Sequence, residues 1–254
     1  MEGLRDKTVL LFGGAGGIGT ATSRRLAAEG ANVAISSLHQ ENAEKVAGVV
    51  NEEGGTALGL GVDIGDEVSV ADAVAATIER FGGIDAVHVN AANMAMEIIT
   101  NDTDAISIDL DVFDQTVRTN LRGYVVCTQA TLPALLERGG GSIVYTSSAA
   151  VWAGEPERPA YAVTKAGLGP LVRHVASKWG REGIRANAIA PGPTVGEDMD
   201  AMLPPEYKEQ MLATLRHRRL GRPEDIAAMV AFLMSDEGEW ITGQEIRVDG
   251  GRII

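Results

Sequence analysis

Short runs of consecutive apolar residues alternate along the chain with longer stretches in which apolar residues recur every three or four positions. The short runs are rich in β-branched residues, which is typical of parallel strands buried on both faces. They lie at 8–12, 33–36, 57–60, 84–89, 142–146 and 184–190. Helical periodicity fills the stretches between them, at 17–30, 40–53, 66–81, 109–137 and 160–182.

This alternation predicts an α/β fold with a Rossmann-type doubly wound parallel sheet, right-handed crossovers and helices on both faces. The stretch 160–182 has the clearest amphipathic pattern. Five apolar residues share one face of that helix: Leu168, Leu171, Val172, Val175 and Trp179. No linker rich in Pro or Ser and no break in composition divides the chain, so residues 1–254 are predicted to form a single domain.

One segment, at 193–217, interrupts the alternation and is rich in Pro and Met. In open α/β sheets ligands bind beyond the carboxyl ends of the strands, where this segment would emerge. We therefore expect a flap that covers a ligand. The alternative is an exposed connecting helix.

Composition and charge exclude several classes of function. Apolar residues make up 45% of the 254 positions, which is enough for a core. The chain has 22 basic and 35 acidic residues and a net charge of −13, which disfavours nucleic-acid and anionic-membrane partners. The single cysteine, Cys127, cannot form an internal disulfide, and the four histidines show no metal-ligand spacing. We expect a cytoplasmic protein without a metal, in which His88 is a core residue.

A glycine-rich loop follows the first predicted strand directly: Gly-Gly-Ala-Gly-Gly-Ile-Gly over 13–19, with a helical pattern after it. Gly13 permits a sharp turn, Gly17 lets a pyrophosphate approach the backbone, and Gly19 lets the helix pack on the strand. The helix N-terminus offers free N–H groups to phosphates. The predicted contacts are Gly13, Ala15, Gly17, Ile18 and Gly19. A glycine-rich turn that binds nothing is the alternative, and no Gly-Lys-Ser/Thr follows that would indicate a Walker loop.

Tyr161 and Lys165 lie four residues apart and therefore share one face of a helix. A nearby ammonium favours phenolate over phenol, so the pair suits a general acid/base acting on an alcohol or a carbonyl. Ser147 and Ser148 lie at the end of a predicted strand, and Ser148 precedes the tyrosine by 13 residues. The end of a strand and the start of the following helix face the same crevice.

With these motifs in order, nearly the whole chain resembles the short-chain dehydrogenase/reductase family. Asn120, in TNLRGYVV, falls where that family has a catalytic asparagine, and Ser148, Tyr161 and Lys165 match its serine and its Tyr-x-x-x-Lys. Asn90-Ala91-Ala92-Asn93 is similar to its Asn-Asn-Ala-Gly stretch, with two departures. The C-terminal segments GRPEDIA and ITGQEIRVDGG also match.

The resemblance implies that Tyr161 transfers the substrate proton, Ser148 binds the substrate oxygen and Asn120 holds a water that relays protons towards Lys165. Lys165 would bind the nicotinamide ribose and lower the pKa of the tyrosine. The cofactor itself would carry the hydride. The further cofactor contacts implied are Ser37, Asp63, Ile64, Asn90, Ala91, Pro191, Gly192 and Thr194, with Thr194 substituting for a threonine that is replaced by Gly196.

The resulting prediction is an NAD(P)-dependent oxidoreductase that interconverts a secondary alcohol and a ketone. An epimerase or dehydratase is disfavoured because such relatives have a larger C-terminal substrate domain. A non-catalytic cofactor-binding scaffold is disfavoured because it needs no tuned phenol. No acid stands at Ser37 to bind the adenosine ribose, which weakly favours NADP, although a phosphate-binding arginine is also missing.

The resemblance also bears on partners. It implies a homotetramer, with a dimer as the alternative, in which 109–137 and 160–182 pack against a second subunit. Family members that reduce 3-oxoacyl groups on an acidic carrier protein have arginines where this chain has Val126 and Glu182. We therefore expect a free, largely apolar small-molecule substrate. Its entrance would be lined by Met94, Met96, Trp152, Met199 and Met202.

Overall fold

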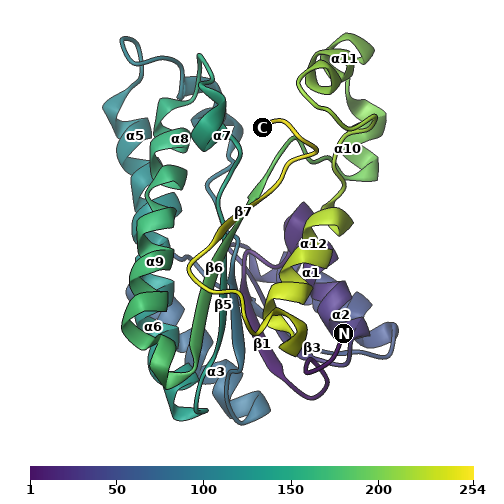
Figure 1. The fold of residues 1–254 in the computed structure, drawn as a ribbon, viewed down its shortest axis with the longest axis vertical. Helices are drawn as coiled ribbons and strands as arrows, with labels where there is room; N and C mark the ends of the chain where they lie inside the picture. The colour runs from purple at the N-terminus through teal and green to yellow at the C-terminus, as the bar shows by residue number, and fades with distance from the viewer.

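A seven-stranded, all-parallel sheet forms the centre of the molecule, with helices on both faces (Figure 1). The computed structural model describes residues 1–254 except for the side chain of Asp198. The strand order is β3-β2-β1-β4-β5-β6-β7, so the chain reverses direction across the sheet between β1 and β4. The strands are β1 (Thr8–Phe12), β2 (Asn32–Ser37), β3 (Thr56–Gly61), β4 (Ala86–Val89), β5 (Gly141–Thr146), β6 (Ile184–Pro191) and β7 (Glu245–Val248).

Both faces of the sheet are covered by core, which explains why the strands are apolar at consecutive positions. Leu10 and Phe12 of β1 pack into the layer formed with α3 (Glu67–Phe81), α6 (Gly123–Glu137) and α9 (Leu168–Trp179). Val9 and Leu11 point to the opposite layer. That layer is built by α1 (Gly17–Ala28), α2 (Gln40–Glu52) and α12 (Pro223–Met234). Successive strand residues thus serve opposite layers, as the pleat requires.

All six strands predicted from apolar runs are present, with small differences at their ends. The largest difference is at the fourth strand, which begins at Ala86 rather than at Ile84 because Ile84 is buried in the loop before it. The seventh strand, β7, alternates charged with apolar residues (Glu-Ile-Arg-Val), and none of the four is fully buried, so no run of consecutive apolar residues reveals it.

The predicted helix over 109–137 is not one regular α-helix. It consists of α5 (Leu110–Val117), a π-helical turn over Arg118–Arg122, and α6. In this turn the Gly123 N–H donates to the Arg118 carbonyl, five residues back, and Asn120 lies inside the turn. A π-turn shifts the side chains after it by one position, and such turns are frequent at functional sites.

The predicted helix over 160–182 is divided too, into α8 (Pro159–Ala166), α9 and a short 3₁₀ turn over Gly180–Glu182. The apolar face of α9 is as expected: Leu168, Val172 and Val175 are buried and pack with the sheet. Because the chain's own sheet covers this face, the apolar face of α9 is not evidence for a second subunit, and the homotetramer implied by the resemblance stays a prediction.

The segment over 193–217 contains two short helices, α10 (Glu197–Met202) and α11 (Pro205–Ala213). A small apolar cluster of Val195, Leu215 and Leu220 anchors its two ends. The segment stands at the end of the molecule where the strands finish, across from α7 (Ala150–Ala153) and near the C-terminus (Figure 1). This position suits the predicted flap, which stays a prediction.

Among the described residues, no helix has both the length and the apolar character needed to cross a membrane.

Candidate active site

The four predicted catalytic residues come from three elements that meet beyond the carboxyl end of β5. Ser148 follows β5, Tyr161 and Lys165 lie on α8, and Asn120 lies in the π-turn between α5 and α6. The Lys165 ammonium donates to the Thr146 carbonyl at the end of β5, at 2.7 Å, and lies 5.9 Å from the centre of the Tyr161 ring. Helix α8 therefore brings the proposed acid/base and its lysine to the strand end that carries the serine.

Asn120 is fully buried, and its amide connects two loops of the site. Its Oδ1 accepts a hydrogen bond from the backbone N–H of Asn93 at 2.8 Å, which fixes the loop after β4. Within the part of the chain that the structure describes, its Nδ2 has no partner. An unpartnered buried donor is costly, so this group is available to a molecule bound in the crevice.

The pKa of the Tyr161 phenol is shifted in the direction opposite to the one expected from the sequence. Burial raises the pKa of the Tyr161 phenol, and the Ser148 hydroxyl and the positive charge of Arg158 act in the opposite direction without overcoming it. The Arg158 guanidinium lies 5.1 Å from the centre of the Tyr161 ring. Without a bound cofactor, Tyr161 is thus a protonated phenol, and the lowering of its pKa expected from Lys165 does not dominate.

Lys165 is one of the most deeply buried polar groups in the molecule, with 1% of its surface exposed. Burial lowers the pKa of its ammonium to about 7. Besides Thr146, it donates to the phenol oxygen of Tyr124 at 2.8 Å. Sequence reasoning missed Tyr124, because a tyrosine one turn after Asn120 has no spacing that separates it from ordinary core packing.

A second missed residue, Asp102, holds the start of α8. Its carboxylate accepts hydrogen bonds from the backbone N–H groups of Ala160, at 3.0 Å, and Tyr161, at 2.9 Å. Asp102 is buried, with 3% of its surface exposed. It caps a helix that begins 57 residues further along the chain, at Pro159, so no local sequence signal could reveal it.

The glycine loop has the geometry expected of a dinucleotide cradle. Gly13 has φ +79°, and a Cβ on it would lie 2.6 Å from the backbone of Ala91. A Cβ on Gly19 would clash with the carbonyl oxygen of Gly13, whereas one on Gly17 would meet nothing within 4 Å. Gly16, at the N-cap of α1, provides no side chain to occupy the free amides of the helix. The loop is therefore open where phosphates would bind.

The loop after β4 closes onto this cradle. Asn90 Nδ2 donates to the Gly13 carbonyl at 3.0 Å, and its Oδ1 accepts from the Thr146 hydroxyl at 3.0 Å. The backbone N–H of Ala91 donates to Phe12 at the end of β1. Three of the predicted cofactor residues, Gly13, Asn90 and Ala91, are thus brought together where the chain reverses across the sheet.

The remaining predicted cofactor residues lie at the ends of strands or directly after them. Ser37 ends β2, Asp63 and Ile64 follow β3, and Pro191, Gly192 and Thr194 end or follow β6. The Asp63 carboxylate forms an ion pair with Arg118 at 2.9 Å, and the Thr194 hydroxyl donates to the Gly192 carbonyl at 3.0 Å. A buried hydroxyl next to Ser37, that of Ser36, has no partner among the described residues. The residues at the carboxyl ends of these strands, together with the Ser36 hydroxyl, fit a nicotinamide dinucleotide.

His88 is a core histidine, as expected, but it is only half satisfied. Its Nε2 lies 3.0 Å from the Thr146 hydroxyl, and its Nδ1 has no partner within the described part of the chain. Burial lowers the pKa of His88 to about 3, so the ring is neutral at physiological pH. No group of three or more metal-binding side chains occurs among the described residues, and Cys127 is buried.

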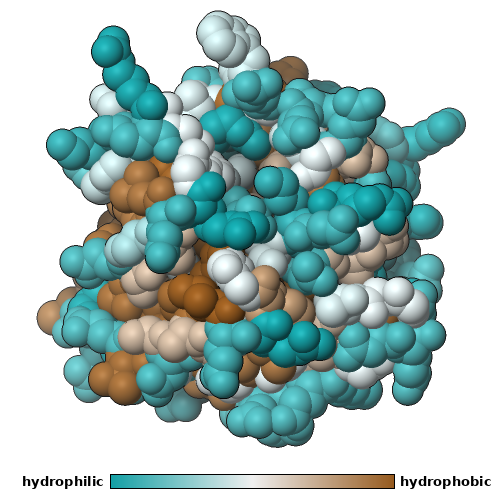
Figure 2. Space-filling view, turned by 90° about the horizontal axis from the view of Figure 1, so that it is seen from below, coloured by the Kyte–Doolittle hydropathy of each residue, from teal (hydrophilic) through white to brown (hydrophobic). Residues whose placement is uncertain are grey.

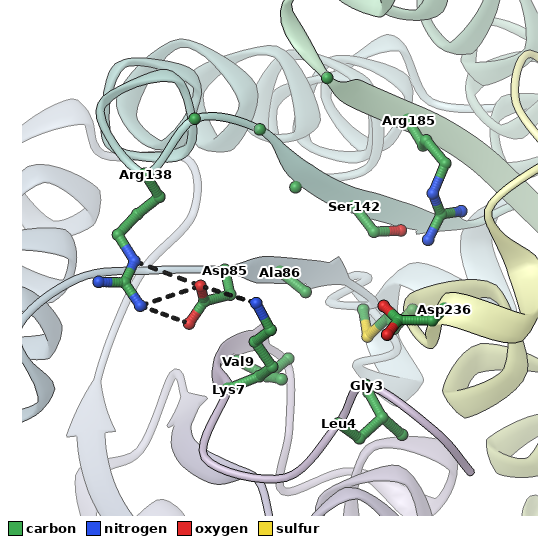
Figure 3. Close-up of a pocket in the computed structure, with 15 residues that line it drawn as sticks. Gly3, Leu4, Lys7, Val9, Asp85, Ala86, Arg138, Ser142, Arg185 and Asp236 are labelled. Atoms are coloured by element: carbon green, nitrogen blue, oxygen red, sulfur yellow. Dashed lines mark hydrogen bonds and ion pairs between the residues drawn. The ribbon is translucent and has the colours of Figure 1, made fainter.

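A pocket of about 280 Å³ lies at the opposite end of the sheet, where the strands begin (Figure 3). Three of its charged residues form ion pairs: Asp85 pairs with Arg138 at 3.1 Å and with Lys7 at 3.7 Å. Arg185 donates to two backbone carbonyls. Seen from below, this end of the molecule is largely hydrophilic around smaller apolar areas (Figure 2). The pocket is remote from Tyr161, and its paired charges stabilise the fold.

Comparison with known proteins agrees with this geometry. The profile of a family described as Enoyl-(Acyl carrier protein) reductase matches residues 13–252. A probable short-chain type dehydrogenase/reductase of Bradyrhizobium diazoefficiens is 38% identical over 100% of this chain and 89% of its own length. A 3-oxoacyl-[acyl-carrier-protein] reductase of Staphylococcus aureus is 35% identical over 96% of this chain and 97% of its own.

The fold also matches a solved structure of a 7α-hydroxysteroid dehydrogenase in complex with NADH and 7-oxoglycochenodeoxycholic acid. The TM-score is 0.89 and the identity 28%, over 98% of this chain and 95% of the other. The glycine cradle, the convergence of Tyr161 and Lys165 with the strand end, and these matches identify the class. The chain belongs to the short-chain dehydrogenase/reductase family, and it is an oxidoreductase of that family.

Proposed function

We propose that the protein interconverts a secondary alcohol and a ketone with NAD(P), and that Tyr161 is the general acid/base. One observation carries this proposal: Tyr161 and Lys165 of α8 stand beside Ser148 at the strand end next to the glycine cradle. A scaffold that only binds a cofactor has no need for a buried ammonium next to a phenol. Burial of such a charge costs several kcal/mol by order of magnitude.

The residues divide the proton chemistry between them. When bound, the cofactor supplies or accepts the hydride. In the direction of reduction, the protonated phenol of Tyr161 donates a proton to the substrate oxygen, which Ser148 orients by a hydrogen bond. In the direction of oxidation, the same phenol oxygen accepts the proton. Lys165 binds the ribose and, when it is charged, stabilises the phenolate form of Tyr161.

The raised pKa of the free phenol fits the acid half of this cycle. A proton donor must be protonated at the working pH, and burial provides for that at Tyr161. For alcohol oxidation, the positive charge of Lys165 has to offset the increase in the pKa of Tyr161 that burial causes. The pKa of about 7 at Lys165 places its change of charge within the physiological range. The rate of the oxidation step should thus depend on the protonation of one lysine.

The proposed cofactor is NAD(P), with a weak preference for NADP. Ser37 ends β2 where an acid would bind the adenosine ribose hydroxyls and repel a 2′-phosphate. The nearby carboxylate of Asp63 is paired with Arg118. Equilibrium titration with both oxidised cofactors tests this preference, and clearly tighter binding of NAD would overturn it.

The proposed substrate is a free, largely apolar ketone or secondary alcohol. The five apolar residues predicted at the entrance are all exposed: Met94, Met96, Trp152, Met199 and Met202. Thioethers form an adaptable apolar lining. A charged cluster follows Trp152 in the sequence. In it, Glu155 pairs with Arg158 at 3.0 Å and with Arg252 at 2.5 Å.

The test is a panel of free cyclic and aryl ketones and the matching alcohols, assayed with both cofactors by the absorbance of reduced nicotinamide. Net oxidation or reduction supports the proposal. Turnover of the organic substrate without net change in the cofactor would indicate the epimerase or dehydratase alternative. Cofactor binding without turnover of any compound would favour the non-catalytic scaffold.

A further inference from the structure

The buried ammonium of Lys165 is held by two oxygens, and one of them belongs to a residue outside the family motif. This residue is Tyr124 on α6, which is fully buried and lies one turn after Asn120. Its phenol oxygen is 2.8 Å from Lys165 Nζ. The same hydroxyl donates its hydrogen to the Thr146 carbonyl at 3.2 Å, and that carbonyl also accepts from Lys165 at 2.7 Å.

These contacts fix the direction of each hydrogen bond. The hydrogen of the Tyr124 hydroxyl is directed to Thr146, so its oxygen presents a lone pair to Lys165. The ammonium also lies 4.7 Å from the centre of the Tyr124 ring. That ring stacks on Tyr145 of β5, with 6.2 Å between ring centres, which holds the phenol in place. Burial raises the pKa of Tyr124 well above its usual value, so the group stays a neutral phenol.

We propose that Tyr124 is a positioning residue: its hydroxyl fixes the Lys165 ammonium and stabilises the positive charge on it. This inference rests on the proposed function, in which Lys165 binds the ribose and stabilises the Tyr161 phenolate. The protein binds two of the three hydrogens of the ammonium, so one remains for the ribose. A hydrogen bond accepted from a charged group is stronger than a neutral one, particularly where water is excluded.

Because Lys165 is the donor in this hydrogen bond, the bond should raise the pKa of the lysine. The Tyr124 oxygen interacts with the hydrogens of the charged ammonium and thereby opposes the desolvation that lowers the pKa of Lys165. Loss of this oxygen should lower the pKa of Lys165 further. Fewer molecules would then have a charged lysine near pH 7, and the Tyr161 phenolate would be less stable.

The test compares Tyr124→Phe with Tyr145→Phe as a matched control. Tyr145 is also fully buried and stacks on Tyr124, but its hydroxyl bonds to that of Thr128 at 2.8 Å and makes no contact with Lys165 among the described residues. Both changes remove one buried phenol oxygen and keep the ring. A difference between the variants therefore reports the contact with Lys165.

The main measurement is a titration of the protein without cofactor, labelled with ¹³C at lysine Cε and followed by NMR. The chain has five lysines, so the Lys165 signal can be assigned by replacing the other four one at a time. We expect the Lys165 midpoint to fall by about one pH unit in Tyr124→Phe, the equivalent of one charged hydrogen bond. It should stay unchanged in Tyr145→Phe. An unchanged midpoint in Tyr124→Phe, or an equal shift in both variants, would overturn the inference.

A measurement on the unaltered chain covers the case in which Tyr124→Phe does not fold. With ¹³C at tyrosine Cζ, the Tyr124 signal should shift with the same midpoint as Lys165 Cε. A Tyr124 signal that ignores the lysine titration would contradict the inference. Neither NMR titration needs substrate or cofactor, so either can fail while the proposed function stands, and the reverse also holds.

With an active substrate in hand, a third readout is the pH profile of alcohol oxidation. Oxidation needs the Tyr161 phenolate, which a charged Lys165 stabilises. The lower limb of the profile should therefore move to higher pH in Tyr124→Phe and stay in place in Tyr145→Phe. A purely structural contribution of Tyr124 would reduce turnover at every pH without moving the limb.

Discussion

Lys165 is the charged side chain of the site that burial destabilises most clearly. The residue has 1% of its surface exposed, and burial brings the pKa of its ammonium down to about 7. Its two acceptors, the Thr146 carbonyl and the Tyr124 hydroxyl, are both neutral. The chain thus accepts a desolvated charge without a carboxylate partner. This arrangement leaves the charge sensitive to whatever binds beside it.

This residue predicts how stability changes with pH. The folded pKa of Lys165 lies below its unfolded value of 10.5, so the unfolded state binds more protons between about pH 7 and 10.5. The contribution of Lys165 to the free energy of unfolding should therefore rise with pH through that window. Urea unfolding of the unaltered chain and of Lys165→Met, at pH 7 and at pH 9.5, measures it.

The expected gain of the unaltered chain over Lys165→Met is about 1 kcal/mol or more between these two pH values, since one pKa unit is worth roughly that much. Other titrating groups are common to both proteins and cancel in the difference. A difference that is constant with pH would show that the lysine titrates near its unfolded value, and one that runs in the opposite direction would show that its folded pKa is raised; either result contradicts the prediction.

At this scale the sequence predicted which residues lie together better than it predicted their energetics. The spacing of Tyr161 and Lys165, and the serine at the strand end, were enough to predict that the proposed catalytic residues meet. The protonated state of the Tyr161 phenol was not predictable, because burial dominates its pKa and depends on the whole surrounding fold. The contact between Tyr124 and Lys165 was hidden for the same reason: it links residues 41 positions apart.

The position of helix α8 depends on a cap that comes from elsewhere in the chain. Asp102 accepts the N–H groups of Ala160 and Tyr161, and the latter is the backbone of the proposed acid/base itself. A local N-cap would be Arg158, which has φ +62° and no side-chain capping bond. The first turn of α8 is therefore held by one buried carboxylate from the end of the short helix α4 (Met96–Asn101).

We predict that Asp102→Ala lowers the free energy of unfolding by about 1–2 kcal/mol, a usual cost for a lost cap. It should also lower turnover more than tenfold while cofactor binding changes little, because the phenol moves with its backbone. Urea unfolding, steady-state kinetics and cofactor titration measure the three effects.

Asp109→Ala is the matched control for this cap. Asp109 caps α5 by accepting the N–H of Asp111 at 3.0 Å, and has no hydrogen bond to α8 in the described structure. Its loss should reduce stability with a much smaller effect on turnover. Equal losses of turnover in the two variants would mean that Asp102 only stabilises the fold.

At the scale of helices and strands, apolar periodicity does not reveal local changes in helix type. A continuous helical pattern over 109–137 conceals the π-turn at 118–122, because one extra residue per turn changes the apolar spacing by too little over so short a stretch. Yet this turn is what places Asn120 in the site. The glycine loop, by contrast, was predictable in detail, since a tight turn and a close approach leave glycine as the only residue that fits.

The whole molecule carries a net charge of −13, which bears on the kind of substrate it meets. One position used in the sequence argument, Val126, is buried in the core and presents nothing to a partner. The other, Glu182, is exposed and acidic. An acidic carrier protein would approach against a field of its own sign, which slows association at low salt.

We therefore predict a higher specificity constant for free cyclic or aryl ketones than for a 3-oxoacyl group on a carrier protein. Steady-state kinetics with both kinds of substrate, at low and high salt, decide it. A preference for the carrier-bound substrate that weakens as salt rises would reveal an electrostatic dock and contradict this prediction.

A second prediction at this scale is a homotetramer, with a dimer as the alternative. The apolar face of α9 does not support an oligomer, because the chain's own sheet covers that face. Exposed apolar residues on the neighbouring helices still do: Val125 on α6 is 41% exposed and Val163 on α8 is 55% exposed. Light scattering at micromolar concentration should give four times the mass of the chain, and a monomer would contradict the prediction.

The architecture as a whole was the most predictable feature. A sheet covered on both faces needs apolar strands and amphipathic helices in alternation, and that pattern is visible without any homologue. The edge strand β7 was the exception, because charged residues alternate with apolar ones along it and leave no apolar run. The orientation of the segment over 193–217, the predicted flap, also depends on contacts between distant segments, such as the pairing of Thr194 with Gly221.

The central claim, that Tyr161 transfers the proton in a nicotinamide-dependent reaction, is tested most directly by Tyr161→Phe. The ring and Lys165 remain, so the dissociation constants of the oxidised and reduced cofactors should change little. Turnover of the best ketone from the panel should fall by more than about a hundredfold, a barrier increase of about 2.7 kcal/mol. Turnover within about tenfold of the unaltered enzyme, with cofactor binding intact, would contradict the account.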